Sequence, residues 1–221
     1  MKKTEKAIFT WSGGKDSAMA FYELKKSGKY TLEALLTTIT EDYKRVSMHG
    51  TRECLLEKQA ASLDLPLSKV FISKKSSNQE YKEKMKNALT PYKNKGIDSV
   101  VFGDIFLESV RSYREANLSK VGMKAVFPLW KKNTRELANF FIDRGFKTIL
   151  TCVDTKFLDG KFAGREYDKQ LLSEFPETID PCGENGEFHT FVYDGPIFKE
   201  KVEFNKGGKT MQNDRWFLEI Y

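Results

Sequence analysis

The first thirty residues combine an apolar run, two adjacent glycines and a helical pattern in immediate succession. Residues 5–11 favour a β-strand, Ser12-Gly13-Gly14 a tight turn, and residues 15–27 carry apolar side chains at helical spacing. Adjacent glycines let the backbone adopt positive φ and approach an anion, and the following helix directs free N–H groups and its positive dipole end to the same point. The sequence therefore predicts a βα unit with a phosphate-binding turn, and a nucleotide as its ligand.

The spacing inside this turn excludes two common nucleotide-binding motifs. A Walker A loop needs an upstream glycine that is absent here, and the Rossmann pattern Gly-x-Gly-x-x-Gly is also absent. In the remaining pattern Lys15 can neutralise phosphate charge, and the hydroxyls of Ser12 and Ser17 can donate to it. Asp16 either orients Mg²⁺ or caps the helix. The alternative is an ordinary Gly-Gly turn with a polar cap.

Strand and helix patterns continue to alternate after the turn. We expect strands at 32–40, 70–72 and 99–103, and helices at 51–64 and 78–95, the second with a bend at Pro91. Short connections between such elements predict βαβ units, and hence an α/β fold with a parallel sheet. In these sheets ligands bind at the carboxyl ends of the strands.

The 221 residues suffice for one large domain or for one domain and a smaller one. From a change of composition we expect two domains, one at 1–125 that carries the nucleotide-binding turn and a C-terminal substrate-binding domain at 126–221; the resemblance named below implies that the first binds ATP. The second contains a predicted helix over 133–145, a strand over 148–153, a site-bearing segment over 158–200 and closing β structure over 201–221.

Composition narrows the class of protein further. Hydrophobic residues make up 40% and charged residues 31%, and no run approaches the roughly 20 apolar residues of a membrane span. We therefore expect a cytoplasmic protein without membrane contact. Cys54, Cys152 and Cys182 are too far apart for a Cys-x-x-Cys pair, which favours reduced thiols. The net charge of +6 is modest, so we do not expect nucleic-acid binding.

A second polar group follows the strand at 99–103. Gly103 and Asp104 come directly after apolar residues, and Arg111 and Arg114 follow three residues apart on a predicted helix. A carboxylate at the end of a strand suits Mg²⁺, and the arginines suit a phosphate or a substrate carboxylate. The alternative is a helix cap at Asp104 with Glu-to-Arg pairs on the surface.

A third group lies at 180–191, where acids, glycines and a histidine gather in twelve residues. This density favours a shaped functional loop over a plain surface turn. A fourth lies at 47–52 around His49, which fits a site or the entry to a helix equally well.

Six motifs in this order cover nearly the whole chain and resemble the diphthine–ammonia ligase family of N-type ATP pyrophosphatases. They are Ser-Gly-Gly-Lys-Asp-Ser (12–17), Phe-Gly-Asp-Ile-Phe (102–106), Phe-Pro-Leu-Trp (127–130), Phe-Ala-Gly-Arg-Glu-Tyr (162–167), Pro-Cys-Gly-Glu-Asn-Gly-Glu-Phe-His-Thr (181–190) and Asp-Gly-Pro-Ile-Phe (194–198). The resemblance implies a parallel sheet of the adenine nucleotide α-hydrolase (HUP) type with a smaller C-terminal α+β domain. It also implies ATP-driven conversion of a carboxylate to an amide, with release of AMP and pyrophosphate.

The polar groups described above and the resemblance together imply roles for these residues, with His189 as a possible base that deprotonates ammonium. ATP and Mg²⁺ are the implied cofactors, with Asp104 near the metal. The implied catalytic residues are Lys15, Asp104, Glu184, Glu187 and His189. The implied nucleotide-binding residues are Ser12, Gly13, Gly14, Lys15, Asp16, Ser17, Gly103 and Asp104. The implied substrate-binding residues are His49, Arg111, Arg114, Gly183, Glu184, Asn185, Glu187, His189 and Thr190.

One departure from the family pattern concerns the acceptor. The family continues Gly-Glu with an aromatic residue and then Glu-Thr, whereas this chain has His189 before Thr190, and residues 48–50 resemble a distinct branch. The sequence leaves open the identity of the carboxylate, the source of ammonia and the oligomeric state, with a homodimer as one alternative. Two other functions also stay open, a PP-loop RNA-modifying enzyme and a non-enzymatic sensor of ATP or AMP.

Overall fold

The parallel strands expected in the first half of the chain form one twisted sheet. We describe it from a computed structural model, which describes residues 4–46 and 50–221. Within that part of the chain β4, β2, β1, β5 and β6 run parallel in this order, and β3 pairs antiparallel with the end of β2. The strands are β1 (Glu5–Thr10), β2 (Tyr30–Thr40), β3 (Arg45–Val46), β4 (Leu67–Ile72), β5 (Ser99–Val101) and β6 (Lys124–Val126).

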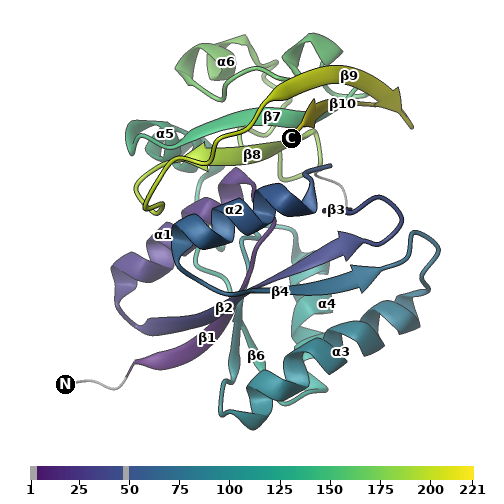
Figure 1. The fold of residues 1–221 in the computed structure, drawn as a ribbon. Coiled ribbons are helices and arrows are strands. Elements are labelled where there is room, and N and C mark those ends of the chain that lie inside the picture. The colour runs from purple at the N-terminus through teal and green to yellow at the C-terminus, as the bar shows by residue number, and fades with distance from the viewer. Residues whose placement is uncertain (1–3, 47–49) are drawn as a thin grey trace.

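Helices cover both faces of this sheet because its strands are apolar on both sides. On one face lie α1 (Lys15–Ser27) and α2 (Glu53–Leu63), and on the other α3 (Asn78–Asn94) and α4 (Glu108–Ser119) (Figure 1). Successive residues of a strand point to opposite faces. In β1, Phe9 packs edge-on against Phe21 of α1, whereas Ile8 belongs to the core beneath α3 and α4.

The second half of the chain forms a smaller antiparallel sheet. Its order is β8-β7-β10-β9, built from β7 (Lys147–Asp154), β8 (Phe188–Asp194), β9 (Lys206–Gln212) and β10 (Arg215–Ile220). Helices α5 (Thr134–Asp143) and α6 (Lys169–Glu174) and a short 3₁₀ helix (Gly160–Phe162) accompany it. The predicted fold class, a parallel α/β sheet with a smaller second unit, is confirmed.

The second sheet packs over the face that α1 and α2 cover (Figure 1). One apolar core contains Phe9 and Phe21 together with Phe141 of α5 and Phe188 of β8. Leu55 of α2 shares another core with residues of the second sheet. The two sheets therefore meet through continuous apolar packing, and a site at the end of the first sheet can have its cover supplied by the second.

Most predicted elements form, although several bounds differ. The predicted segment at 180–191 is a loop only in its first part, because β8 begins at Phe188, and the two-residue strand β3 was not predicted. The predicted domain boundary between residues 125 and 126 stays a prediction. Strand β6 (Lys124–Val126) runs across this position.

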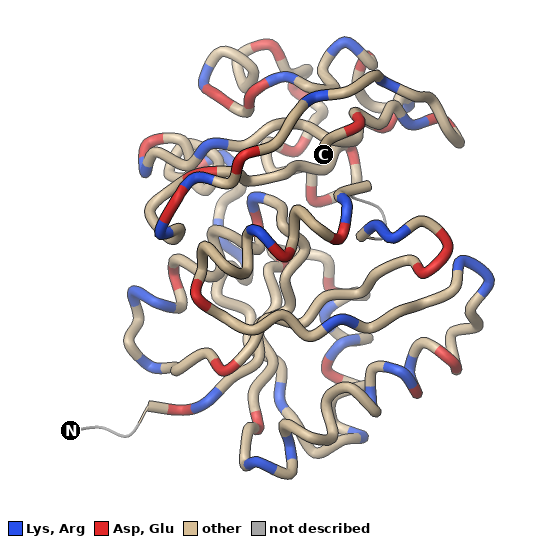
Figure 2. The backbone as a smooth tube through the Cα atoms, in the orientation of Figure 1, with Lys and Arg blue, Asp and Glu red and all other residues tan. Residues whose placement is uncertain are grey.

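Charged positions are dispersed over the molecule. Blue lysine and arginine positions and red acidic positions are scattered over both sheets and their helices (Figure 2), so the excess of +6 does not form a single basic stripe over the part of the chain that is described. In that same part, no helix combines the length and the apolar character needed to cross a membrane.

Candidate active site

The turn after β1 has the backbone expected of a phosphate-binding loop. Gly13 has φ +79°, and a Cβ on it would lie 2.7 Å from Gln59 Oε1 and 2.8 Å from Leu56 Cδ2 of α2. Only a glycine fits in this conformation and this space. Gly14 precedes α1, and no side chain of the described residues caps the helix there.

The uncapped start of α1 leaves backbone donors for a ligand. The first N–H groups of a helix have no partner within it, and of these the Lys15 N–H is taken by Thr190 Oγ1 at 3.0 Å. By the same rule the amides of Asp16 and Ser17, in the first turn of α1, have no partner within the helix and are left as donors. The interpretation of Asp16 as a helix cap is wrong, since Gly14 occupies that position and the Asp16 carboxylate binds Lys15.

Lys15 is buried, with 4% of its surface exposed. Its Nζ lies 2.9 Å from both carboxylate oxygens of Asp16, donates to the carbonyl of Cys182, and sits 5.1 Å from the centre of the Phe188 ring and 5.9 Å from that of Tyr167. Burial acts to lower its pKa, but the charge of Asp16, its hydrogen bond to Lys15 and the charges of Cys182 and Asp180 together outweigh burial, so the pKa of Lys15 is raised. All three ammonium protons have partners, so a phosphate would have to displace one of them.

Gln59 is a buried residue of α2 that was not predicted to belong to the site. Its Nε2 donates to the carbonyls of Gly13 at 3.1 Å and Val192 at 2.6 Å, and its Oε1 accepts from Trp11 Nε1 at 2.8 Å. It thus ties the loop, the end of β1 and β8 together. Its only signal in the sequence is a polar residue at an apolar position of the helical pattern.

Strand β8 of the second sheet adds two further hydrogen bonds to the loop. The N–H of Val192 donates to the carbonyl of Gly13 at 2.9 Å, and Thr190 accepts from the Lys15 N–H as described above. The phosphate-binding turn is therefore held from both sides, by α2 of its own sheet and by a strand of the other.

The end of β5 approaches the start of α1 closely. A Cβ on Gly103 would lie 3.1 Å from the backbone of Asp16 and Ser17, which explains the glycine. The next residue, Asp104, forms an ion pair with Arg114, with Oδ2 2.7 Å from Nε. Asp104 is no helix cap, because Leu107 precedes α4.

The two arginines of α4 have different surroundings. The Arg114 guanidinium lies 4.4 Å from the centre of the Phe102 ring and beside Asp104. Arg111 pairs with Glu115 at 2.8 Å and lies over the rings of Phe127 and Trp130. Arg111 does not line the cleft described below, so its role in substrate binding stays a prediction.

The loop over 180–187 brings Glu184 to the first sheet. Its Oε1 accepts from the N–H groups of Ile105 at 2.8 Å and Phe106 at 3.3 Å. Burial, together with the charge of Asp16, raises the pKa of Glu184 to about 7, against the lowering effect of these two bonds. A carboxyl group with this pKa exchanges a proton near neutral pH, as a general acid or base does.

Glu187 lies inside the loop instead of facing the cleft. It is 1% exposed, and its Oε1 accepts from the Asp180 N–H at 3.1 Å and from Asn185 Nδ2 at 3.0 Å. Asp180 Oδ2 in turn accepts from the N–H of Glu184 at 2.9 Å. Glu187 and Asn185 therefore position Glu184, in place of the catalytic and substrate-binding contacts predicted for them.

These elements surround a cleft of about 490 Å³ at the carboxyl ends of the strands. It is lined by predicted site residues of the phosphate loop, of the β5–α4 connection and of the second sheet. These are Ser12, Lys15, Asp16, Ser17, Gly103, Asp104, Arg114, Gly183, Glu184, His189 and Thr190. Gly13 and Gly14 form the loop without lining the cleft, and His49 lies outside the described residues.

The cleft also has apolar and hydroxyl-bearing walls that the sequence did not single out. They come from the ends of β1, β2 and β4 and from α3, and include Trp11, Thr37, Thr38, Ile72 and Tyr81. A cleft of this size with few convergent polar groups is typical of a small-molecule site.

The donor set fits a nucleotide better than a protein-held metal. Among residues 4–46 and 50–221 no group of three or more acidic, histidine or cysteine side chains is arranged to hold an ion. Asp16, Asp104 and Glu184 nevertheless line one cleft, and Mg²⁺ commonly uses one or two carboxylates together with substrate phosphates. The residues thus fit Mg²⁺ only in company with a phosphate ligand.

Comparison with known proteins places these features in one family. The family model described as diphthamide synthase N-terminal domain matches residues 5–125, and the one described as diphthamide synthase C-terminal domain matches residues 133–221. The diphthine–ammonia ligase of Schizosaccharomyces pombe is 28% identical over 212 residues, which cover 86% of this chain and 34% of that protein.

Vertebrate relatives match a shorter stretch. The diphthine–ammonia ligase of Mus musculus is 28% identical over 129 residues, which cover 56% of this chain and 48% of that protein. The diphthine–ammonia ligase of Danio rerio is 27% identical over 130 residues, which cover 56% of this chain and 51% of that protein. The chain thus spans about a third to a half of the length of these curated relatives. With both family models matched in sequence order, the chain belongs to the diphthine–ammonia ligase family.

Proposed function

We propose that this protein is an ATP-dependent ligase that adenylates a substrate carboxylate and then converts it to an amide with ammonia. The observation that supports the proposal most strongly is that the turn at 12–17 and the loop at 180–187 both line one cleft. The turn at 12–17 offers amide donors to phosphate, and the 180–187 segment brings Glu184 beside Asp104 and the start of α1. The name of the relatives, diphthine–ammonia ligase, supports ammonia as the nitrogen donor.

The first part of the proposed reaction uses the first sheet. The amides of Asp16 and Ser17 and the dipole of α1 bind the β- and γ-phosphates, and Lys15 exchanges its contact with Cys182 for phosphate oxygen. Asp104, with Asp16, would hold Mg²⁺ together with the phosphates, and the ion would neutralise their charge. Positioning and electrostatics of this kind dominate catalysis of phosphoryl and nucleotidyl transfer.

The two proposed steps balance without a covalent enzyme intermediate. A carboxylate oxygen of the acceptor attacks the α-phosphorus, and the bond from that phosphorus to the β-phosphate bridging oxygen breaks, which releases pyrophosphate and leaves an acyl adenylate. Ammonia then attacks the acyl carbon, the carbon–oxygen bond to AMP breaks, and the products are AMP and an amide.

Glu184 is the residue we assign to the proton in the second step. Ammonium is protonated at neutral pH and must lose a proton before it can attack. A carboxylate whose pKa is raised to about 7 accepts that proton better than an ordinary one. His189 lines the same cleft and is the second candidate for a group that contacts the acceptor or ammonia.

The products of ATP test the proposal directly. Purified protein is incubated with Mg-ATP, ammonium and an extract of small carboxylates and proteins, and nucleotides are separated by chromatography. We expect AMP and pyrophosphate, with ammonium increasing their release. Formation of ADP, or no AMP and pyrophosphate under any of these conditions, would contradict the proposal.

Matched variants separate the ligase from the two alternatives. Glu184→Gln should slow amidation by about 10² to 10⁴ while ATP still binds, and Glu177→Gln, on an exposed residue, should change nothing. A sensor would bind ATP without turnover in the wild type and in both variants. A thiol-dependent RNA-modifying enzyme would lose activity in Cys182→Ser, whereas we expect that variant to stay active, because burial raises the pKa of the Cys182 thiol and makes it a poor nucleophile.

A further inference from the structure

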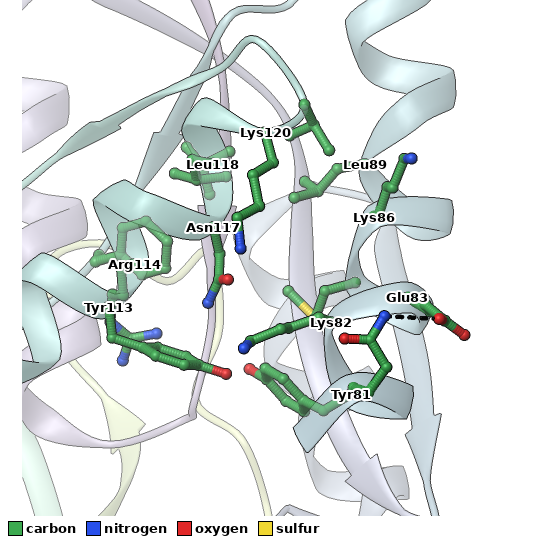
Figure 3. A pocket seen from close by; sticks show the side chains of 15 residues that line it. Tyr81, Lys82, Glu83, Lys86, Leu89, Tyr113, Arg114, Asn117, Leu118 and Lys120 are labelled. Atoms are coloured by element: carbon green, nitrogen blue, oxygen red, sulfur yellow. Dashed lines mark hydrogen bonds between the residues drawn. The ribbon is translucent and has the colours of Figure 1, made fainter. Parts of the chain in front are cut away.

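A second cavity lies between α3 and α4, on the face of the first sheet that the second sheet does not cover. It has a volume of about 320 Å³, within the range of small-molecule sites, and Figure 3 shows it from close by. Residues from α3, α4, β5 and the connection after α4 line it.

The floor of this cavity is apolar. Leu89, Phe102 and Leu118 are each at most 4% exposed and belong to the core between the sheet and the two helices, with Met85 and Val121 packed against that core. Water in contact with such a floor is displaced favourably by an apolar group. The floor therefore favours a ligand with an apolar body.

The rim is positively charged and its charge is not neutralised. Lys82, Lys86 and Lys120 form no ion pair with any described residue, and Lys82 Nζ lies 5.8 Å from the centre of the Tyr113 ring. The one acid in the lining, Glu83, accepts from Gln79 Nε2 at 2.8 Å.

The close view shows how these groups are directed. The ammonium groups of Lys82 and Lys120, the amide of Asn117 and the hydroxyl of Tyr81 point into the shared space, whereas Glu83 points away from it (Figure 3). Burial raises the pKa of the Tyr81 phenol, so it keeps its proton and can donate. Cations and neutral donors above an apolar floor are complementary to an anion with an apolar body.

The cavity shares a wall with the nucleotide cleft. Tyr81, Met85, Phe102 and Arg114 line both, and Arg114 is held in that wall by Asp104 on the cleft side and by the Phe102 ring. A ligand that contacts Arg114 from the cavity side acts on a residue that also borders the cleft.

We propose that the cavity between α3 and α4 is a second ligand site, which binds a small molecule with an apolar body and one negatively charged group. Binding there does not require the ligase reaction, so the site stands or falls independently of the proposed function. Its shared wall links it to the cleft, and by linkage each ligand alters the affinity of the other by the same factor.

Two fluorescent probes that differ in charge test the site. The anion 8-anilinonaphthalene-1-sulfonate and the neutral N-phenyl-1-naphthylamine carry similar rings, and both are titrated into the folded full chain. We expect saturable binding of one molecule of either probe. Asn117→Trp should fill the cavity and weaken both probes at least tenfold.

Charge reversal then isolates the cationic rim. Lys82→Glu combined with Lys120→Glu should weaken the anionic probe at least tenfold and leave the neutral one within about twofold. The matched control is Lys26→Glu combined with Lys29→Glu, on exposed residues of the opposite face, and it should change neither. Circular dichroism and thermal unfolding check that all variants are folded.

Two results would overturn the site. The first is that each probe binds Asn117→Trp with the same affinity as it binds the wild type. The second is that the affinity of the anionic probe does not change when Lys82 and Lys120 are both replaced by glutamate. The titration is repeated with saturating ATP to test the link through Arg114. We expect the affinity of the anionic probe to change, and an unchanged affinity would contradict the link.

Discussion

At the scale of single residues, Glu184 combines a fixed position with an unusual acidity. Two backbone amides of the β5–α4 connection hold its carboxylate, while burial and neighbouring acids raise its pKa to about 7. An ordinary glutamate titrates near pH 4.3, so the change of protonation that matters for function moves into the neutral range.

The pH dependence of activity follows from this pKa. If Glu184 accepts the proton, it must be deprotonated, so the amidation rate should fall about tenfold for each pH unit below about 7 and level off above it. In Glu184→Gln the rate should fall by about 10² to 10⁴ and lose this dependence. Initial rates measured between pH 5 and 9 for the wild type, Glu184→Gln and the control Glu177→Gln check both expectations. If the rate of Glu184→Gln still rises with pH as in the wild type, the titrating group is another residue.

Gln59 contributes to stability through groups that only it satisfies. Gln59→Leu leaves Trp11 Nε1 and a carbonyl of β8 buried without this partner, at about 1–3 kcal/mol each, so we expect a loss of about 3 kcal/mol in the free energy of unfolding. Urea unfolding measures it. Gln170→Leu, on an exposed part of α6, should stay within about 0.5 kcal/mol of the wild type; similar values for the two variants would contradict the role of Gln59.

At the scale of elements, the approach of β5 to the start of α1 fixes the shape of the phosphate site. Gly103→Ala would place a methyl group 3.1 Å from the backbone of Asp16 and Ser17. Because neither backbone can yield without moving the first turn of α1, we expect at least a tenfold loss in ATP affinity by calorimetry. Gly208→Ala in β9 meets open space and is the matched control; an equal affinity in both variants would show that the contact is unimportant.

The sequence predicted this element pattern well because it rests on local features. Apolar periodicity and the glycines at 13, 28 and 145 mark elements through the chain's own backbone preferences. The assignment of side chains within the site was weaker, since it depends on partners distant in sequence. Glu187 turns into its loop because Asp180 and Asn185 donate to it, and Gln59 is buried because Gly13 and Val192 come to it.

At the scale of the whole molecule, the two sheets share one apolar core and one phosphate loop. A ligand bound between them should therefore stabilise both at once. At a concentration 100 times its dissociation constant, ATP should add about 2.7 kcal/mol to the free energy of unfolding. For a chain of this size that raises Tm by roughly 5–10 °C.

Differential scanning calorimetry checks this expectation. We expect a single transition that shifts as a whole when Mg-ATP is added. Two transitions of which only one responds to ATP would indicate that the sheets unfold separately and that the nucleotide contacts only one of them.

The join between the loop and β8 also determines how this site can change during evolution. At Val192 the join uses only main-chain atoms, because Gln59 Nε2 donates to its carbonyl and its N–H donates to the carbonyl of Gly13. The side chain at 192 is buried in the apolar core, so it can change to another apolar group without removing these hydrogen bonds. Thr190 contributes a hydroxyl, and its replacement would have to be compensated within the loop itself. Change at 192 is thereby limited by apolar packing, whereas change at 190, only two residues away, is limited by the nucleotide site.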